Sequence, residues 1–464
     1  MSRHPTTLPG HMRAVAILGL PLVGGHLAQF AIGLTDTIMV GWYGVEELAA
    51  LTLAHTVFIV FFLLGAGFAF AVMPMVASYA AQGDETRIRR VTRMGLWLSI
   101  LFFALSMPVF WFSGPLLLGL GQAAALAEMA QDYLRIAGLG LLPALGVMVL
   151  KSYLAALEET RAVFLITAVA AVLNVVFNYA LIFGRLGLPE LGIRGAALAS
   201  VLTHCVALAG AMIYSDRKLP DHDLFGRFWV PDWESFRAVF RLGWPIGVTN
   251  LSEVGLFAAS AVLMGWLGTV PLAAHGVAIQ LATAAFMFHL GLSNAATVRA
   301  GNAFGAGDAD RLAKGAWAAL ILSVAASLLA IVVFLTLPEL MIGIFLDPAD
   351  PDRAAIIAAG TGLLAMAALF QLVDGAQVIA LGLLRGVQDA RVPMVMAAIA
   401  YWALGLPAAW IAGFVLPWGA VGIWAGLVIG LGAASVMLLY RFWARALPTF
   451  AATGRSLAPE AAPH

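Results

Sequence analysis

The sequence predicts an all-α integral membrane protein with twelve transmembrane helices, arranged as two six-helix lobes that are parallel repeats of each other. Of its 464 residues, 62% are hydrophobic and only 11% are charged, with a mean hydropathy of +0.95. A soluble domain would carry about a quarter charged residues. A stretch of the chain also recurs: shifted by 224 positions, residues 21–50 align with residues 245–274 without a gap. Parallel repeats of membrane helices are one known plan of transporters.

The repeat preserves the residues that shape a helix and differs at two positions that carry charge. Pro21 aligns with Pro245, and the pair Gly41-Trp42 aligns with Gly265-Trp266. Asp36 of the first copy aligns with Ser260 of the second, and Gln29 aligns with Glu253. Each half is therefore expected to carry one acid in this apolar helix, on different turns.

The spans follow from the length of the apolar segments, because a membrane-spanning helix needs about 20 predominantly apolar residues. Twelve segments qualify: 13–40, 48–81, 94–113, 133–155, 162–183, 191–214, 238–267, 272–298, 315–337, 355–384, 392–415 and 419–444. Five prolines lie in or near the ends of spans: Pro21, Pro74, Pro143, Pro245 and Pro407. They are expected to bend the helices that contain them, because proline interrupts the backbone hydrogen bonds.

The longest polar segment between spans separates the two repeats and sets the predicted domain boundaries. Residues 1–214 form the N-terminal lobe, 215–237 the cytoplasmic linker between the lobes, and 238–446 the C-terminal lobe. The last residues, 447–464, are rich in Ala and Pro and are expected to form a disordered tail.

The distribution of Lys and Arg predicts the orientation. Twelve spans place both termini on one side, and 21 of the 25 Lys and Arg residues belong to that side. Positive charge accumulates on the cytoplasmic side of membrane proteins, so both termini are expected to be cytoplasmic. Trp42, Trp111, Trp266 and Trp418 then lie at outer helix ends, as expected for interfacial aromatic residues.

Composition and motifs also exclude several classes of function. The net charge is zero, so no basic surface for nucleic acid is indicated, and the lipid bilayer is the expected macromolecular environment. Cys205 is the single cysteine, which excludes an internal disulfide and a multi-cysteine metal site. The chain has no phosphate-binding loop of the ATPase type, so ATP-driven transport by this chain is not expected. No cofactor is expected.

Three acids in apolar helices are the strongest candidates for a functional site: Asp36, Glu253 and Asp374. An ionised acid at the centre of a bilayer costs about 2.5–3.5 kcal/mol or more, so such residues are functional by default. No Lys or Arg is expected at comparable depth to neutralise them. This favours a mobile cation, Na⁺ or H⁺, as their partner, with Na⁺ bound by these three carboxylates.

Polar residues at helical spacing accompany each acid. Asn250 lies three residues before Glu253, so both belong to one helix face, and Gln371 and Gln377 flank Asp374 in the same way. Two asparagines of the fifth span, Asn174 and Asn178, also share a face, and Ser200 lies among small residues of the sixth span. Amide, hydroxyl and carboxylate oxygens are the ligands that a hard cation takes. The asparagine pair is equally compatible with hydrogen bonds between helices.

Taken together, these motifs resemble the multidrug and toxic-compound extrusion family, in its NorM-type bacterial branch. The resemblance covers the whole chain and rests on four segments, in sequence order PLVGGHLAQFAIGLTDTIMVGWYG with Asp36, NVVFNYALIFGRLGLPELGIRGAALAS with Asn174, Asn178 and Ser200, NLSEVGLF with Glu253, and LFQLVDG with Asp374. It implies a monomeric antiporter of the bacterial cytoplasmic (inner) membrane that exports cationic amphiphilic drugs in exchange for Na⁺ or H⁺ by alternating access. Ser200 is often threonine in the family, and serine keeps the hydroxyl.

Parts of the sequence also invite comparison with two other functions. A flippase for a lipid-linked precursor, from the same superfamily, would line its cavity with Arg or Lys to bind phosphates, and the spans here lack such residues. An intramembrane aspartyl protease would use a GxGD motif, which GAGD at 305–308 imitates. That motif lies in a loop beside Arg311 and Lys314, and its repeat counterpart is AQGD at 81–84. An enzyme is therefore not expected.

Overall fold

The structure is a computed structural model that describes residues 6–348 and 351–454, and every regular element in these ranges is helical. In the first half of the chain the helices are α1 (Leu8–Tyr43), α2 (Val45–Gln82), α3 (Glu85–Trp111), α4 (Ser113–Gly119), α5 (Ala124–Leu139), α6 (Leu141–Ala156), α7 (Thr160–Ile182), α8 (Gly192–Lys218) and the 3₁₀ turn η1 (Pro220–His222). In the second half they are α9 (Trp233–Leu267), α10 (Thr269–Gly305), α11 (Ala309–Thr336), α12 (Pro338–Gly343), α13 (Arg353–Gly386), α14 (Arg391–Ala398), α15 (Leu406–Trp410), α16 (Gly419–Arg441) and α17 (Leu447–Thr453), with π-helical segments η2 (Ile399–Gly405), η3 (Ile411–Val415) and η4 (Phe442–Ala446).

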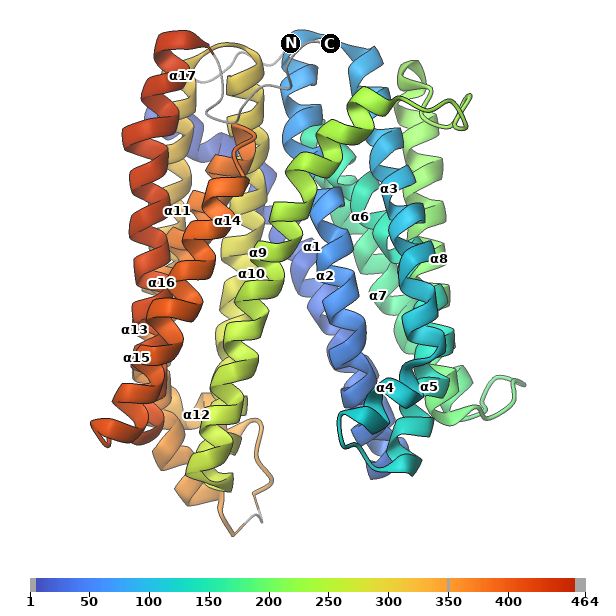
Figure 1. Cartoon of the computed structure of the whole chain (residues 1–464), viewed down its shortest axis with the longest axis vertical. Helices are drawn as coiled ribbons and strands as arrows, with labels where there is room; N and C mark the ends of the chain where they lie inside the picture. The colour runs from blue at the N-terminus through green and yellow to red at the C-terminus, as the bar shows by residue number, and fades with distance from the viewer. Residues whose placement is uncertain (1–5, 349–350, 455–464) are drawn as a thin grey trace. The chain divides into compact units, whose positions relative to one another are not determined.

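The number of potential spans agrees with the sequence. Among the described residues, 11 helices are long and apolar enough to cross a membrane, or up to 12 if one bent pair counts as a span. That pair is α5 and α6, which meet at an angle of 42°. The prediction of an all-helical membrane fold is therefore confirmed, and Figure 1 shows the long helices coloured by their place in the chain, from blue at the N-terminus to red at the C-terminus.

Helix breaks follow the prolines only in part. Pro21, Pro74 and Pro245 lie inside α1, α2 and α9, which continue through them as single helices. The 42° bend between α5 and α6 comes at Gly140, three residues before Pro143. Pro407 lies between the π-helical segments η2 and η3, where its missing N–H coincides with a change in the helical hydrogen-bond pattern.

The chain forms two compact units, and their boundaries fall inside helices. One unit comprises residues 1–23 and 249–464, and the other comprises residues 24–248. Helix α1 therefore passes from the first unit into the second, and α9 passes back. The lobe boundaries predicted from the repeat, with a linker at 215–237, stay a prediction.

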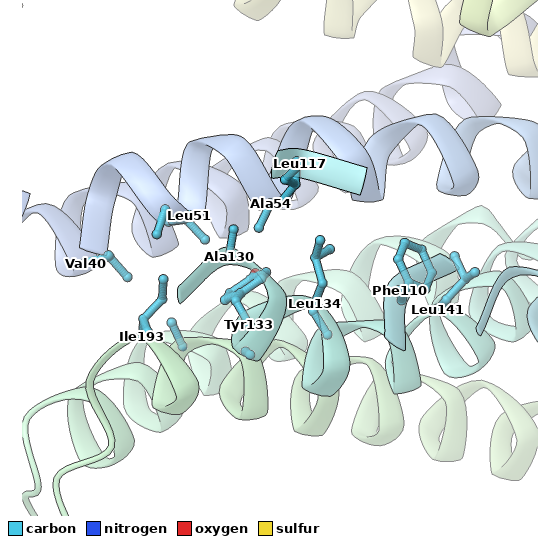
Figure 2. Packing of buried hydrophobic residues seen from close by; sticks show 14 of the residues in the cluster. Val40, Leu51, Ala54, Phe110, Leu117, Ala130, Tyr133, Leu134, Leu141 and Ile193 are labelled. Carbon is cyan, nitrogen blue, oxygen red and sulfur yellow. The ribbon is translucent and has the colours of Figure 1, made fainter. Parts of the chain in front are cut away.

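The core of the unit 24–248 lies where α2, α5 and α8 pack together, and it supports the end of α1 that contains Asp36. Figure 2 shows buried side chains from these helices meeting in one cluster, together with Val40 of α1, and it includes Tyr133 of α5. Phe110, Leu134 and Leu141 extend this cluster along the helices and are fully buried. Burial of large apolar side chains at close packing is what stabilises such a cluster and fixes the helices around it.

The first part of the predicted linker region is folded onto the unit 24–248. Helix α8 continues to Lys218, and η1 follows at Pro220–His222. The guanidinium of Arg93 on α3 donates hydrogen bonds to the carbonyl oxygens of Asp223, Leu224 and Gly226, with 2.6 Å to Leu224. Trp97 donates to the carbonyl of Phe228 at 3.0 Å. These contacts tie the segment after η1 to α3.

The predicted disordered tail needs a correction at its start. Residues 447–453 form helix α17, and the side chain of Phe450 is buried against Phe304 with ring centroids 5.0 Å apart. Pro448 is the second residue after the π-helical segment η4, so its missing N–H coincides with a change in the helical hydrogen-bond pattern. The rest of the predicted tail, residues 455–464, lies outside the described residues.

Candidate functional site

The first candidate site belongs to the unit 24–248 and is centred on the carboxylate of Asp36. Its Oδ1 atom accepts hydrogen bonds from the side-chain amides of Asn174 at 3.0 Å and Asn178 at 2.6 Å. Its Oδ2 atom accepts a hydrogen bond from the hydroxyl of Ser200 at 3.0 Å. The structure thus brings together four of the residues that the sequence nominated, from helices α1, α7 and α8.

Local sequence explains how α7 and α8 bring their polar groups to Asp36. Asn174 and Asn178 are four residues apart on α7, so both amides project from one face. Helix α8 approaches α7 closely at Gly195, because a Cβ added there would lie 2.9 Å from the backbone nitrogen of Ile182. This close approach carries Ser200, more than one turn further along α8, into the same site.

The hydrogen bonds at Asp36 suit an ionised carboxylate, since all three donors point at its oxygens. Asn174 and Asn178 have no exposed surface, which keeps the site away from bulk water at this side. The Oδ1 atom of Asn178 is buried and has no hydrogen-bond partner. The cluster therefore offers a carboxylate and an additional amide oxygen to a cationic ligand.

The second candidate site belongs to the other unit and lies between α9 and α13. The amide of Gln377 on α13 donates a hydrogen bond to the Oε1 atom of Glu253 on α9 at 3.4 Å. Asp374, three residues before Gln377, is 2% exposed, and its charge interacts with that of Glu253. The two acids that the sequence nominated in the second half therefore form one site.

Several oxygens of this second site lack hydrogen-bond partners. They are Asp374 Oδ1, Gln371 Oε1 and Gln377 Oε1, all buried on α13. Buried polar atoms are satisfied in more than nine cases out of ten, so three such acceptors on one helix face need a physical explanation. A bound cation, or a proton on Asp374, would satisfy them. Oxygen atoms of this kind are the ligands of a hard cation such as Na⁺.

Hydroxyl groups of α10 and α11 fix α13 in the position that forms this site. Ser293 and Thr297 of α10 donate hydrogen bonds to the carbonyls of Val378 and Gly382, at 2.6 Å and 3.0 Å. Ser327 of α11 donates to the carbonyl of Gln371 at 3.0 Å. These contacts hold the backbone of α13 on both sides of Asp374.

One charged residue of the second site was missed by the sequence analysis. Arg385, in the last turn of α13, is 8% exposed, and its Nη2 atom donates a hydrogen bond to Asn250 Oδ1 at 2.9 Å. No Arg or Lys was expected at the depth of these acids, and the structure shows that buried Arg385 reaches Asn250, one turn from Glu253. A signal was available: Arg385 follows Asp374 by 11 residues, about three helical turns, so both lie on the same face.

Other polar residues of this region take packing roles. Trp402 donates a hydrogen bond to the hydroxyl of Ser252, next to Glu253, at 2.8 Å. His275 accepts a hydrogen bond from Trp424 at 3.1 Å, and His289 lies 2.9 Å from the hydroxyl of Ser323. Across residues 6–348 and 351–454, no group of three or more His, Cys, Asp or Glu is arranged to hold a metal ion. The Na⁺ ligation predicted for the three acids stays a prediction.

The similarity of the chain to known proteins agrees with this arrangement. The MatE family model matches residues 21–180 and 245–411, two segments that begin 224 positions apart, as the internal repeat does. The chain belongs to the MatE family. Membership confirms the resemblance to the extrusion family, and a MATE transporter is not an enzyme.

MATE relatives cover nearly all of the chain. A protein of Rhizobium meliloti named probable multidrug resistance protein NorM is 45% identical over 448 residues, 96% of this chain and 95% of its own length. A protein of the same name from Agrobacterium fabrum is 44% identical over 93% of both chains. The chain is thus a NorM-type, multi-pass membrane protein.

Solved MATE structures share the fold. A MATE transporter in a bent conformation has a TM-score of 0.85 at 20% identity and covers 96% of this chain and 98% of its own. The eukaryotic MATE transporter AtDTX14 has a TM-score of 0.84 at 17% identity, with 97% and 99% covered. At these identities the likeness concerns the fold alone.

Proposed function

We propose that this chain exports cationic, amphiphilic small molecules from the bacterial cytoplasm in exchange for Na⁺ or H⁺, by alternating access. The names of the NorM relatives support the multidrug part of this proposal. The observation that carries the ion-coupled part is the buried carboxylate of Asp374, which has an unpartnered oxygen and lies beside two further unpartnered amide oxygens. Both termini are proposed to be cytoplasmic and the protein to act as a monomer in the inner membrane.

The proposal gives each acid site a role in cation exchange. A carboxylate such as Asp36 or Asp374 can bind a drug cation, Na⁺ or a proton. Because each of them uses the same negative charge, binding of one lowers the affinity for the others. Ions and drug that compete for the same charge weaken each other's binding by the same factor, which is the reciprocal coupling that exchange requires. An imposed Na⁺ or H⁺ gradient would then drive the drug outward.

The substitution Asp374→Asn tests the proposal. Asparagine keeps the size of the side chain but can neither bind a proton nor attract a cation with a net charge, so efflux should fall at least about a hundredfold. The measurement is ethidium efflux from proteoliposomes, driven by a Na⁺ gradient and by a pH gradient in separate experiments. Near-normal rates in both would contradict a coupling role for Asp374.

A matched control is Asp389→Asn in the same unit. Asp389 is also 2% exposed, but its Oδ2 atom is paired with Arg441 Nε at 2.6 Å, away from the unpartnered oxygens of α13. Loss of this ion pair should lower stability, because it leaves a partly buried guanidinium without its carboxylate. The efflux rate per correctly folded molecule should stay close to that of the unaltered protein.

A further inference from the structure

A guanidinium group is built into the second acid site. Arg385 is buried in the last turn of α13, and its Nη2 atom lies 2.9 Å from Asn250 Oδ1. Asn250 precedes Glu253 by one turn of α9, so the arginine approaches the acid from the side on which α9 begins. An arginine stays protonated in proteins, so this positive charge is permanent.

The polar groups of the site follow one another along the two helices. Asp374 is followed on α13 by Gln377, whose amide reaches Glu253 at 3.4 Å. Asn250, one turn from Glu253 on α9, then contacts Arg385. The charge of Glu253 interacts with that of Asp374 and, with opposite sign, with that of Arg385. The site thus contains two carboxylates and one fixed cation.

We propose that Arg385 sets the affinity of the Glu253–Asp374 site for the coupling cation and keeps that affinity low enough for release. This inference rests on the proposed function. Two carboxylates in a medium of low dielectric constant attract a cation strongly, and a transporter that binds its ion too tightly cannot complete its cycle. The guanidinium offsets part of that negative charge, and Asn250 holds it one turn away from Glu253.

A purely structural role for Arg385 predicts the opposite change on substitution. If the arginine served only to orient Asn250, its loss would loosen the site and weaken cation binding. If it acts through its charge, loss of that charge should strengthen binding of Na⁺ and of protons alike. The direction in which cation affinity changes therefore distinguishes the two roles. Arg385→Lys, which keeps the positive charge, should have the affinity of the unaltered protein only if Arg385 acts through its charge.

The experiment uses the full-length protein in lipid nanodiscs, with ethidium as the bound fluorescent probe. Na⁺ at fixed pH, and protons in the absence of Na⁺, are titrated to displace it. Arg385→Gln should raise the affinity for the displacing cation about tenfold, after correction for the ethidium affinity measured for each variant, because it removes one positive charge from a site of low dielectric constant. Arg385→Lys should stay within about twofold of the unaltered protein. The titratable groups whose charges act on Arg385 are Glu253 and Tyr401, and Asp374 acts on Glu253.

A matched control is Arg441→Gln, since Arg441 is another partly buried arginine of the same unit, paired with Asp389. It should leave cation affinity unchanged. Unchanged or weaker cation affinity in Arg385→Gln, in a protein that responds to Na⁺ or protons, would overturn the role of Arg385 alone. If neither cation displaces ethidium from the unaltered protein, the proposed exchange function falls as well. Should the Gln variant not fold, Arg385→Met, which keeps an unbranched chain without charge, answers the same question.

Discussion

At the scale of single residues, the two units solve the problem of a buried acid differently. Asp36 receives three hydrogen bonds from neutral side chains, from two asparagines and a serine. Glu253 instead accepts a hydrogen bond from Gln377, and one turn away on the same helix Asn250 accepts a hydrogen bond from Arg385. The repeat aligns Asp36 with Ser260, whose hydroxyl donates to the carbonyl of Phe257 in its own helix. The second copy therefore has no acid at that position.

The role of the asparagine pair can be tested at this scale with Asn174→Leu. The change removes a donor to an ionised carboxylate, an interaction of about 1.5–3 kcal/mol, so ethidium affinity or efflux that depends on Asp36 should fall about tenfold or more. Val172→Leu is the control, because Val172 lies on the same helix with 66% of its surface exposed. Equal losses in both variants would argue against a site shared by Asp36 and Asn174.

At the scale of elements, equivalent loops of the two units are built alike. Glu158, after α6, and Gln388, after α13, both have positive φ, at 65° and 60°. The acid that follows each of them then binds the end of a later helix. Glu159 accepts a hydrogen bond from Tyr214 on α8 at 2.9 Å, and Asp389 pairs with Arg441 on α16. The same backbone turn thus positions an acid against a later helix in both units. The contact is a hydrogen bond from tyrosine in one unit and an ion pair with arginine in the other.

The segment that follows α8 should respond to pH through His222. Its Nδ1 atom lies 2.5 Å from the hydroxyl of Tyr153 on α6. Burial lowers the pKa of His222 from its ordinary value of 6.5, Arg89 lowers it further, and Glu85 and Asp221 oppose the shift. Because the folded state favours the neutral ring, its contribution to stability is present above about pH 6.5 and is lost as the pH falls toward the folded-state pKa.

The measurement is hydrogen–deuterium exchange of the amides in residues 222–230 at pH 7.5 and at pH 5.5, corrected for intrinsic exchange rates. Protection should fall by up to about tenfold for each pH unit below the ordinary pKa. His222→Gln keeps a polar side chain but does not titrate, so its protection should not depend on pH. Equal pH dependence in the two proteins would place the titrating group elsewhere.

At the scale of the whole molecule, equivalent residues of the two repeats form equivalent helix crossings. Gly67 on α2 packs against Gly247 on α9, and a Cβ at Gly67 would lie 2.7 Å from the Cα of Gly247. The equivalent residue in the second copy, Gly291 on α10, packs against Val23 on α1, with 2.6 Å to its backbone nitrogen. In the unit 24–248, the first half of α9, which begins the second copy, therefore packs on α2 of the first copy. In the other unit, the first half of α1, which begins the first copy, packs on α10 of the second copy.

These crossings predict a stability effect for Gly67→Ala and Gly291→Ala. Each methyl group would overlap backbone of the crossing helix, which can only be relieved by moving that helix, so each change should destabilise the protein by about 1–3 kcal/mol. Thermal unfolding in detergent measures the effect. Gly276→Ala on the same helix as Gly291 is the control, since nothing lies within 4 Å of its added Cβ. A loss in the control as large as in Gly291→Ala would show that α10 tolerates no alanine for other reasons.

Composition, apolar length and the 224-residue repeat were enough to predict an all-helical membrane fold with paired halves, because the bilayer admits few spanning structures. The acids Asp36, Glu253 and Asp374 could also be identified from the sequence, because placing a carboxylate in an apolar membrane helix is energetically unfavourable and such residues are rare. Only the tertiary structure decided which donors meet Asp36 and that Arg385 reaches Asn250. It also decided that the first part of α1 belongs to the unit of the second repeat, and the first part of α9 to the unit of the first repeat. These features depend on contacts between residues more than a hundred positions apart in the sequence. The helix crossings that bring such residues together are set by small residues such as Gly67 and Gly195. Helical periodicity within one segment carries no information about these contacts.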